Sequence, residues 1–196
     1  MESEPARVLI VDDEPEVCNV YRDFLTYDHD VITATTGQEA LEKLDETIDV
    51  ILLDRRMPGM SGDEVASRIR ERNLDPKIVM VTAVDPDLDL LHLEFSEYLV
   101  KPVTEAEVKK VVDRMISHIE LETELQGLLQ LASKLSTLES KLSVDELEES
   151  GEYERLVAEF QNNKEQLKSS ESEMDYYHEA IIWKLRGALS EISGST

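Results

Sequence analysis

The chain has 196 residues, of which 20 are basic and 44 acidic, for a net charge of -24 at pH 7. This length suits one domain of ordinary size with a further segment attached. The strong negative charge disfavours nucleic-acid binding through a broad electrostatic patch, because such binding needs a positive surface. The single cysteine, Cys18, excludes an intramolecular disulfide, and we expect it to be a small core residue.

The acid excess is spread along the whole chain. Residues 1–103 carry 10 basic and 24 acidic side chains, and residues 104–196 carry 10 and 20. Two interpretations are open: an acidic face for a basic partner, or the acid-rich surface of a protein from a halophilic archaeon. The even spread favours the second. No apolar run approaches the roughly 18 residues of a membrane span and no signal peptide opens the chain, so we expect a cytoplasmic protein.

The first hundred residues alternate between short apolar runs and amphipathic stretches. Continuous apolar runs indicate strands buried on both faces, and the predicted strands are 7–11, 31–35, 50–54, 77–82 and 98–101. Helices are predicted between them, over 37–47 and 62–72 and from Pro15 onward. The helix that begins at Pro15 should bury Val17, Val20, Tyr21, Phe24 and Leu25. This alternation is typical of an α/β fold with a doubly wound parallel sheet.

Polar residues stand at four of the predicted strand ends. Asp12 and Asp13 follow the first strand, Asp54 ends the third, Thr82 ends the fourth and Lys101 ends the fifth. In a doubly wound sheet these ends share the edge where open α/β sheets bind ligands. Three carboxylates brought together repel one another unless a cation offsets them, and Mg2+ prefers such oxygen ligands. The sequence therefore predicts a magnesium site at this edge.

Four short motifs occur in order along these strands. They are VLIVDDE at 8–14, LDRRMPG at 53–59, VTA at 81–83 and YLVKP at 98–102. In this order and spacing, residues 1–103 resemble the receiver domain of two-component response regulators. The resemblance implies a five-stranded, flavodoxin-like sheet and a signalling protein of a phosphorelay, not an enzyme.

The resemblance also implies roles for the acidic residues. Asp54 would accept a phosphoryl group from a phosphohistidine of a histidine kinase, which gives an acyl phosphate. Asp13, Asp54 and the backbone carbonyl of Arg56 would ligate Mg2+, and Asp12 would contribute through water. Such a metal spreads the charge of the transferring phosphoryl oxygens, which is most of what this chemistry needs.

Three further positions have implied roles at the other strand ends. Lys101 would pair with a phosphoryl oxygen as a compact point charge. The hydroxyl of Thr82 would turn toward another phosphoryl oxygen, and the Tyr98 ring would turn inward when Thr82 moves; a core or edge-strand tyrosine is the alternative. A cis peptide bond is implied between Lys101 and Pro102.

The last ninety residues are predicted to be helical. A helix over 104–142 starts at a capping box of Thr104 and Glu107, and a stripe of apolar residues from Val108 to Leu142 appears continuous. A second apolar stripe follows Gly151. Both predicted helices are about 60 Å long, which favours an antiparallel hairpin. Intermolecular coiled coils, or a dimeric four-helix bundle that makes a homodimer, are alternatives.

This helical region, with Leu138-Glu139 and EYERL at 152–156, is similar to the HalX domain of haloarchaeal response regulators. We therefore expect a receiver domain over 1–103 and a helical output or interaction domain over 104–196. Two other functions are open: a transcriptional regulator whose helices bind DNA or a transcription partner, and a phosphatase with Asp54 as nucleophile. Arg56 stands where such phosphatases need a second acid. A scaffold with a degenerate receiver conflicts with the intact set of site residues.

Two departures from the usual receiver pattern stand out: the spacing from Thr82 to Lys101, and the residues Arg55, Arg56 and Val84 that follow Asp54 and Thr82. The spacing is short, so the fourth receiver helix should be short or reshaped, which puts the usual dimerisation face in doubt. Receivers tune the lifetime of the acyl phosphate at the positions of Arg56 and Val84. Because an apolar Val84 cannot orient a hydrolytic water, we predict slow self-dephosphorylation. A half-life of only seconds, measured by loss of label from the purified phosphoprotein, would contradict this.

Overall fold

The computed structural model describes residues 5–83 and 95–170. The expected short fourth receiver helix and Val84 lie outside these residues, as does the second predicted helix beyond residue 170. The chain divides into two compact units, Met1–Ile119 and Glu120–Thr196.

The first unit is built on a five-stranded parallel sheet, as predicted. Its strands have the order β2-β1-β3-β4-β5, so the chain reverses its winding direction at β1 and β3. Each strand lies within one residue of its predicted position. The strands are β1 Arg7–Val11, β2 Asp30–Ala34, β3 Val50–Leu53, β4 Lys77–Thr82 and β5 Glu97–Val100.

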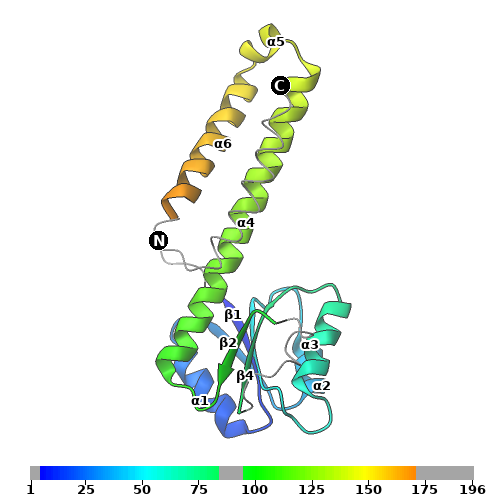
Figure 1. Ribbon diagram of the computed structural model, residues 1–196, viewed down its shortest axis with the longest axis vertical. Coiled ribbons are helices and arrows are strands. Elements are labelled where there is room, and N and C mark those ends of the chain that lie inside the picture. Colours follow the sequence, from blue (N-terminus) through cyan, green and yellow to red (C-terminus); the bar gives the residue numbers. More distant parts are fainter. Residues whose placement is uncertain (1–4, 84–94, 171–196) are drawn as a thin grey trace. The chain divides into compact units, whose positions relative to one another are not determined.

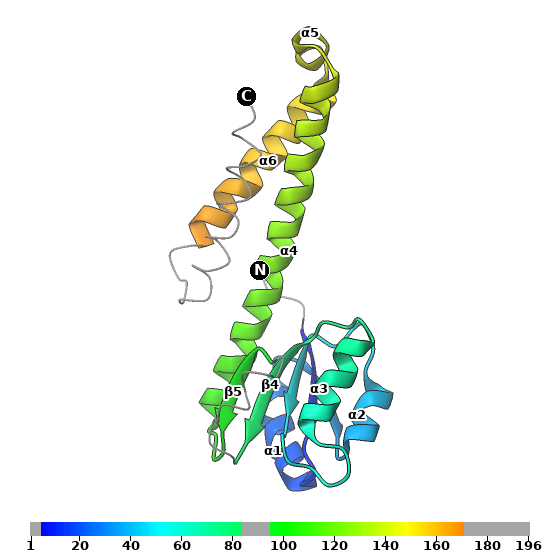
Figure 2. The same ribbon diagram turned by 45° about the vertical axis from the view of Figure 1, so that its right-hand side comes forward.

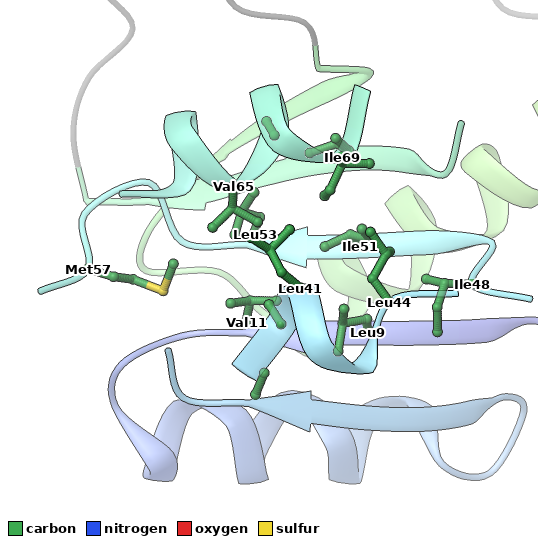
Figure 3. Packing of buried hydrophobic residues seen from close by; sticks show 14 of the residues in the cluster. Leu9, Val11, Leu41, Leu44, Ile48, Ile51, Leu53, Met57, Val65 and Ile69 are labelled. Carbon is green, nitrogen blue, oxygen red and sulfur yellow. The ribbon is translucent and has the colours of Figure 1, made fainter. Parts of the chain in front are cut away.

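Helices cover both faces of this sheet (Figures 1 and 2). Helix α1 (Pro15–Leu25) and the first turns of α4 (Glu105–Lys141) pack on one face, and α2 (Gly37–Lys43) and α3 (Gly62–Glu71) pack on the other. Figure 3 shows the apolar cluster under α2 and α3, which includes Leu41, Leu53, Val65 and Ile69. Successive side chains of each strand point to opposite faces of the sheet. The continuous apolar runs therefore contribute to two hydrophobic cores, one on each face.

Helix α2 is shorter than predicted. It ends at Lys43, and Leu44 is already extended with φ -74° and ψ 124°. The Asp45 side chain accepts a hydrogen bond from the Thr47 backbone N–H at 2.9 Å. Such local side-chain bonds compete with helical ones, so the chain turns here while Leu44 stays buried.

The prediction of which residues α1 buries was wrong for Val20. Cys18, Tyr21 and Leu25 are buried, whereas Val20 is 46% exposed. The buried residues follow a spacing of three and four, and Val20 lies off that face of the helix. Cys18 is a core residue as predicted, and its thiol lies 3.4 Å from the Asp12 carbonyl oxygen, to which it donates.

Helix α4 begins after the predicted capping box. The Thr104 backbone N–H donates to Glu107 Oε2 at 2.8 Å, and the Glu107 N–H donates to the Thr104 hydroxyl. The helix then continues for 37 residues. It carries many charged residues, and no helix in the described part of the chain is long and apolar enough to cross a membrane.

The apolar stripe of α4 is not continuous, contrary to the sequence analysis. The first buried set, which includes Val108, Val112 and Met115, packs in the core beside α1. A second set on the same helix is buried without sharing that face: Leu121, Leu125, Leu128, Leu131, Ala132 and Leu135. At 3.6 residues per turn, the two sets point roughly 140° apart around the helix axis. The change of face occurs between Ile119 and Leu121, where the step is two residues.

The second unit contains the outer part of α4, a short α5 (Val144–Glu148) and α6 (Gly151–Ser170). A capping box starts α5, in which the Ser143 N–H donates to Glu146 Oε2 at 2.9 Å. In both views α6 runs back antiparallel to the outer part of α4 (Figures 1 and 2), and the Tyr153 hydroxyl donates to Glu139 Oε1 at 2.8 Å. The described part of this unit is thus a helical hairpin.

Candidate functional site

The acidic cluster forms where β1 and β3 end side by side. Val11 and Leu53 are paired in register, and the Asp54 backbone N–H donates to the Val11 carbonyl at 2.8 Å. The residues that follow these strands therefore share one edge. Carboxylate oxygens of Asp12, Asp13 and Asp54 all lie within 4.8 Å of one another.

Lys101 reaches this cluster from the end of β5. Its Nζ lies 2.5 Å from Asp12 Oδ2 and 3.6 Å from Asp54 Oδ1. Its backbone N–H donates to the Thr82 carbonyl at 2.8 Å, which fixes the residue beside the end of β4. The peptide bond between Lys101 and Pro102 is cis, as the resemblance implied.

Burial sets the electrostatics of the site. Asp12 is 2% exposed and Asp54 is 7% exposed. Burial raises the pKa of Asp54 above its usual value; Lys101 lowers it in part, and the neighbouring charges of Asp12 and Asp13 add to the rise. Burial acts against the charge on Lys101, yet its hydrogen bond to Asp12 and the two carboxylate charges raise its pKa overall. The lysine is therefore held charged between two buried acids.

Thr82 and Tyr98 lie on neighbouring strands of the same edge. Thr82 is 1% exposed at the last position of β4. Tyr98 is paired in register with Met80, and its ring centroid lies 5.9 Å from that of Phe95. The ring packs against the apolar cluster under α2 and α3 and is half-buried. Tyr98 interacts with the Arg55 guanidinium and contributes to raising the pKa of Arg55.

The loop after Asp54 contributes main-chain groups to the site. The Arg56 backbone N–H interacts with the Asp54 carboxylate and favours the charged form of the acid, which lowers the pKa of Asp54 in part. The Arg56 side chain itself is exposed. The backbone carbonyl of Arg56 is the group for which the resemblance implied metal ligation.

Two features of this loop were missed in the sequence analysis. The first is an ion pair between Arg55 and Asp63, with 3.1 Å between Arg55 Nε and Asp63 Oδ2. The second is Gly62, where a Cβ atom would clash with the Asp54 carbonyl oxygen. The glycine could have been suspected from its place in a tight turn, but nothing in the sequence pairs Arg55 with Asp63.

The donor set fits a hard divalent cation. Carboxylate oxygens and a backbone carbonyl are the ligands that Mg2+ prefers, and it keeps several waters besides. Two buried acids with a single lysine between them also leave negative charge that a cation would offset.

Comparisons with known proteins agree with this geometry. The sequence profile of the response regulator receiver domain matches residues 8–113, and that of the HalX domain matches residues 117–182. The "Putative transcriptional regulator" of Haloferax volcanii is 43% identical over 143 residues, which are 72% of this chain and 24% of that protein. The alkaline phosphatase synthesis transcriptional regulatory protein PhoP of Bacillus subtilis is 35% identical over 120 residues.

Among solved structures, the response regulator TrrA of Thermotoga maritima in complex with Mg2+-BeF is 36% identical, with a TM-score of 0.50. The match covers 56% of this chain and 98% of that one. Fold, site and profile together define a receiver-type signalling domain. The chain belongs to the response regulator receiver family, and its receiver is followed by a HalX domain. It spans about a quarter of the Haloferax protein, and its match covers 50% of PhoP.

Replacing Gly62 with alanine tests how closely the loop passes behind the acceptor. The added Cβ would meet main-chain atoms of Asp54 and Arg55, which cannot move as a flexible side chain can. We expect a loss of about 1–3 kcal/mol in the free energy of unfolding, the range for overpacking. Gly127→Ala is the control, because a Cβ there meets nothing within 4 Å and should stabilise α4 slightly. Equal urea midpoints for the two variants would contradict this.

The raised pKa of Asp54 predicts how stability depends on pH without metal. Because burial favours the protonated acid in the native state, the free energy of unfolding falls as pH rises above the ordinary carboxyl range. Asp54→Asn removes the titrating carboxyl group and, with it, this pH-dependent loss of stability. In EDTA the variant should therefore be more stable than the wild type at neutral pH, with the difference vanishing in acid.

The control for this prediction is an aspartate with the opposite shift. Hydrogen bonds from Thr47 lower the pKa of the exposed Asp45, so Asp45→Asn should not stabilise the protein at neutral pH. Urea unfolding in EDTA across the pH range measures both variants. A wild type more stable than Asp54→Asn at neutral pH would contradict the prediction.

Proposed function

We propose that this protein is a phosphorylation-controlled switch that accepts a phosphoryl group on Asp54 from a histidine kinase. The observation that carries this is the convergence of three carboxylates and Lys101 at the edge where β1, β3 and β5 end. Membership of the receiver family supports the same role.

In this reaction a carboxylate oxygen of Asp54 attacks the phosphorus of the phosphohistidine. The phosphorus–nitrogen bond breaks, its electron pair returns to the imidazole, and an acyl phosphate forms. The Arg56 N–H orients the attacking carboxylate, and burial keeps competing water away from it. Lys101, which already contacts Asp54, is placed to pair with a phosphoryl oxygen.

Asp13, Asp54 and the Arg56 carbonyl would hold Mg2+, with Asp12 contributing through water. The bound metal would supply charge stabilisation for the transferring group. That TrrA was solved with Mg2+-BeF supports a magnesium site in this family. Thr82 and Tyr98 are the proposed switch residues, because Thr82 ends β4, the strand next to β3, and Tyr98 lies on β5, the strand beyond it.

The proposed output is the helical domain over 104–196. Helix α4 supports this proposal, because it contributes buried residues to the receiver core and continues as one helix into the second unit. Phosphorylation at Asp54 would bias how these helices pair, and a homodimer through the helical segment is the proposed assembly. This is a local charge change acting on a two-state element.

A transcriptional role is the second candidate. The HalX match and the Haloferax relative favour it, and contact with a transcription partner is compatible with an acidic domain. Direct DNA binding is less well supported, because residues 104–196 carry 10 basic and 20 acidic side chains. A salt-titrated binding assay separates the two, since sequence-specific binding with a steep salt slope would favour DNA.

Incubation with acetyl phosphate and Mg2+ tests the phosphoacceptor directly. The wild type should gain the mass of one phosphoryl group, and Asp54→Ala should gain none. Asp75→Ala is the matched control, because this exposed acid pairs with Arg70 on the surface and should leave labelling unchanged. Labelling of Asp54→Ala to the wild-type level would refute the proposed acceptor. The same samples on size exclusion with light scattering show whether phosphorylation changes assembly.

A further inference from the structure

Three segments of the receiver meet at the Arg55 guanidinium. Arg55 follows the acceptor residue, and its side chain is only 14% exposed. Its Nε donates to both carboxylate oxygens of Asp63, in the first turn of α3, at 3.2 and 3.1 Å. Tyr98 on β5 also interacts with this guanidinium, and the interaction contributes to the raised pKa of Arg55.

The loop between β3 and α3 is closed twice by Arg55. Its carbonyl accepts a hydrogen bond from the Gly62 N–H at 2.9 Å, which closes the loop through the main chain. Its side chain closes the loop again through Asp63. Arg56 lies within the closed loop, and its backbone N–H interacts with the Asp54 carboxylate and lowers the pKa of that acid in part.

Tyr98, on β5, is the second residue that interacts with the Arg55 guanidinium. Its ring is packed against Phe95 and the apolar cluster under α2 and α3, so the hydroxyl has little freedom to move away. The loop after the acceptor is thereby joined to β5, the strand that ends at Lys101.

The Arg55–Asp63 ion pair is less exposed to water than an ordinary surface ion pair. Exposed pairs are worth only about 0–1 kcal/mol, because water screens the charges and the long side chains lose freedom. Here the Asp63 side chain is 30% exposed and the Arg55 side chain less so. Burial acts against the Arg55 charge, but Asp63 and Tyr98 more than offset it and raise the pKa of Arg55.

We propose that Arg55 is a positioning residue of the phosphorylation site. It holds the loop in the shape that presents the Asp54 carboxylate and the Arg56 carbonyl to Mg2+, and it ties that loop to Tyr98. The inference rests on the proposed function, because it assigns the metal to the same site. Arg55 acts through the loop and does not itself contact the metal or the phosphoryl group.

The test is the Mg2+ affinity of the unphosphorylated full chain, followed by amide resonances in an NMR titration with MgCl2. Loss of a residue that orients metal ligands typically costs 10–100-fold in affinity. Arg55→Ala should therefore raise the dissociation constant about tenfold. Asp63→Asn should raise it severalfold, and Tyr98→Phe, which removes the hydroxyl that interacts with Arg55, by about twofold. Arg55→Lys should recover only part of the affinity, because an ammonium cannot reproduce the guanidinium geometry.

Arg70→Ala is the matched control, since it breaks the Arg70–Asp75 ion pair at the far end of the same helix. Its Mg2+ affinity should equal that of the wild type. Rates with acetyl phosphate give a second readout: Arg55→Ala should need more Mg2+ for half-maximal rate, with a maximal rate within about twofold of the wild type.

The outcomes separate the two proposals. A wild type that binds Mg2+ but gains no phosphoryl group would overturn the proposed function. A phosphorylated wild type with unchanged Mg2+ affinity in both Arg55→Ala and Asp63→Asn would overturn the role of Arg55 alone. If Arg55→Ala fails to fold, Asp63→Asn and Tyr98→Phe decide the matter, because each keeps the size of the original side chain closely.

Discussion

One ammonium group between two buried carboxylates is the interaction on which the receiver depends. Lys101 contacts both Asp12 and Asp54, which are nearly inaccessible to water. Two such acids could not both be ionised at the same place without a nearby positive charge. Lys101 supplies one, and the arrangement still leaves room for a divalent cation. The residues of the site thus leave part of its negative charge unneutralised. This suits the proposed binding of a metal ion together with a phosphoryl group.

The sheet topology produces this arrangement. The chain winds from β1 to β2 and then returns past β1 to β3, so residues far apart in sequence end on one edge. Gly62 lets the chain pass close behind the acceptor, and the cis bond before Pro102 follows directly on the lysine. The strands carry long apolar runs into the two cores, and the polar residues of the site stand at or just beyond the strand ends.

Much of this could be predicted from the sequence, because buried parallel strands are continuous apolar runs and their polar ends are conspicuous. The strands and the grouping of Asp12, Asp54 and Lys101 follow from that pattern. The early end of α2 was missed because an Asp45–Thr47 turn competes with helix over a few residues. The pairing of Arg55 with Asp63 and Tyr98 was missed for another reason. Side chains that meet only in the folded state leave no periodic signal, and an arginine after an acceptor has many possible partners.

The change of buried face along α4 has a mechanical consequence. A helix with its two apolar sets on one side could rock over that side and keep both covered. With the sets on different faces of a single continuous helix, a twist about its axis would disturb the packing around Val112 and the packing around Leu128. Packed faces tolerate only discrete rearrangements. Such a twist would therefore switch the helix between alternative packing arrangements and would not shift it continuously. Torsion, which requires no lengthening or bending of the helix, is therefore the motion this element is best built to carry.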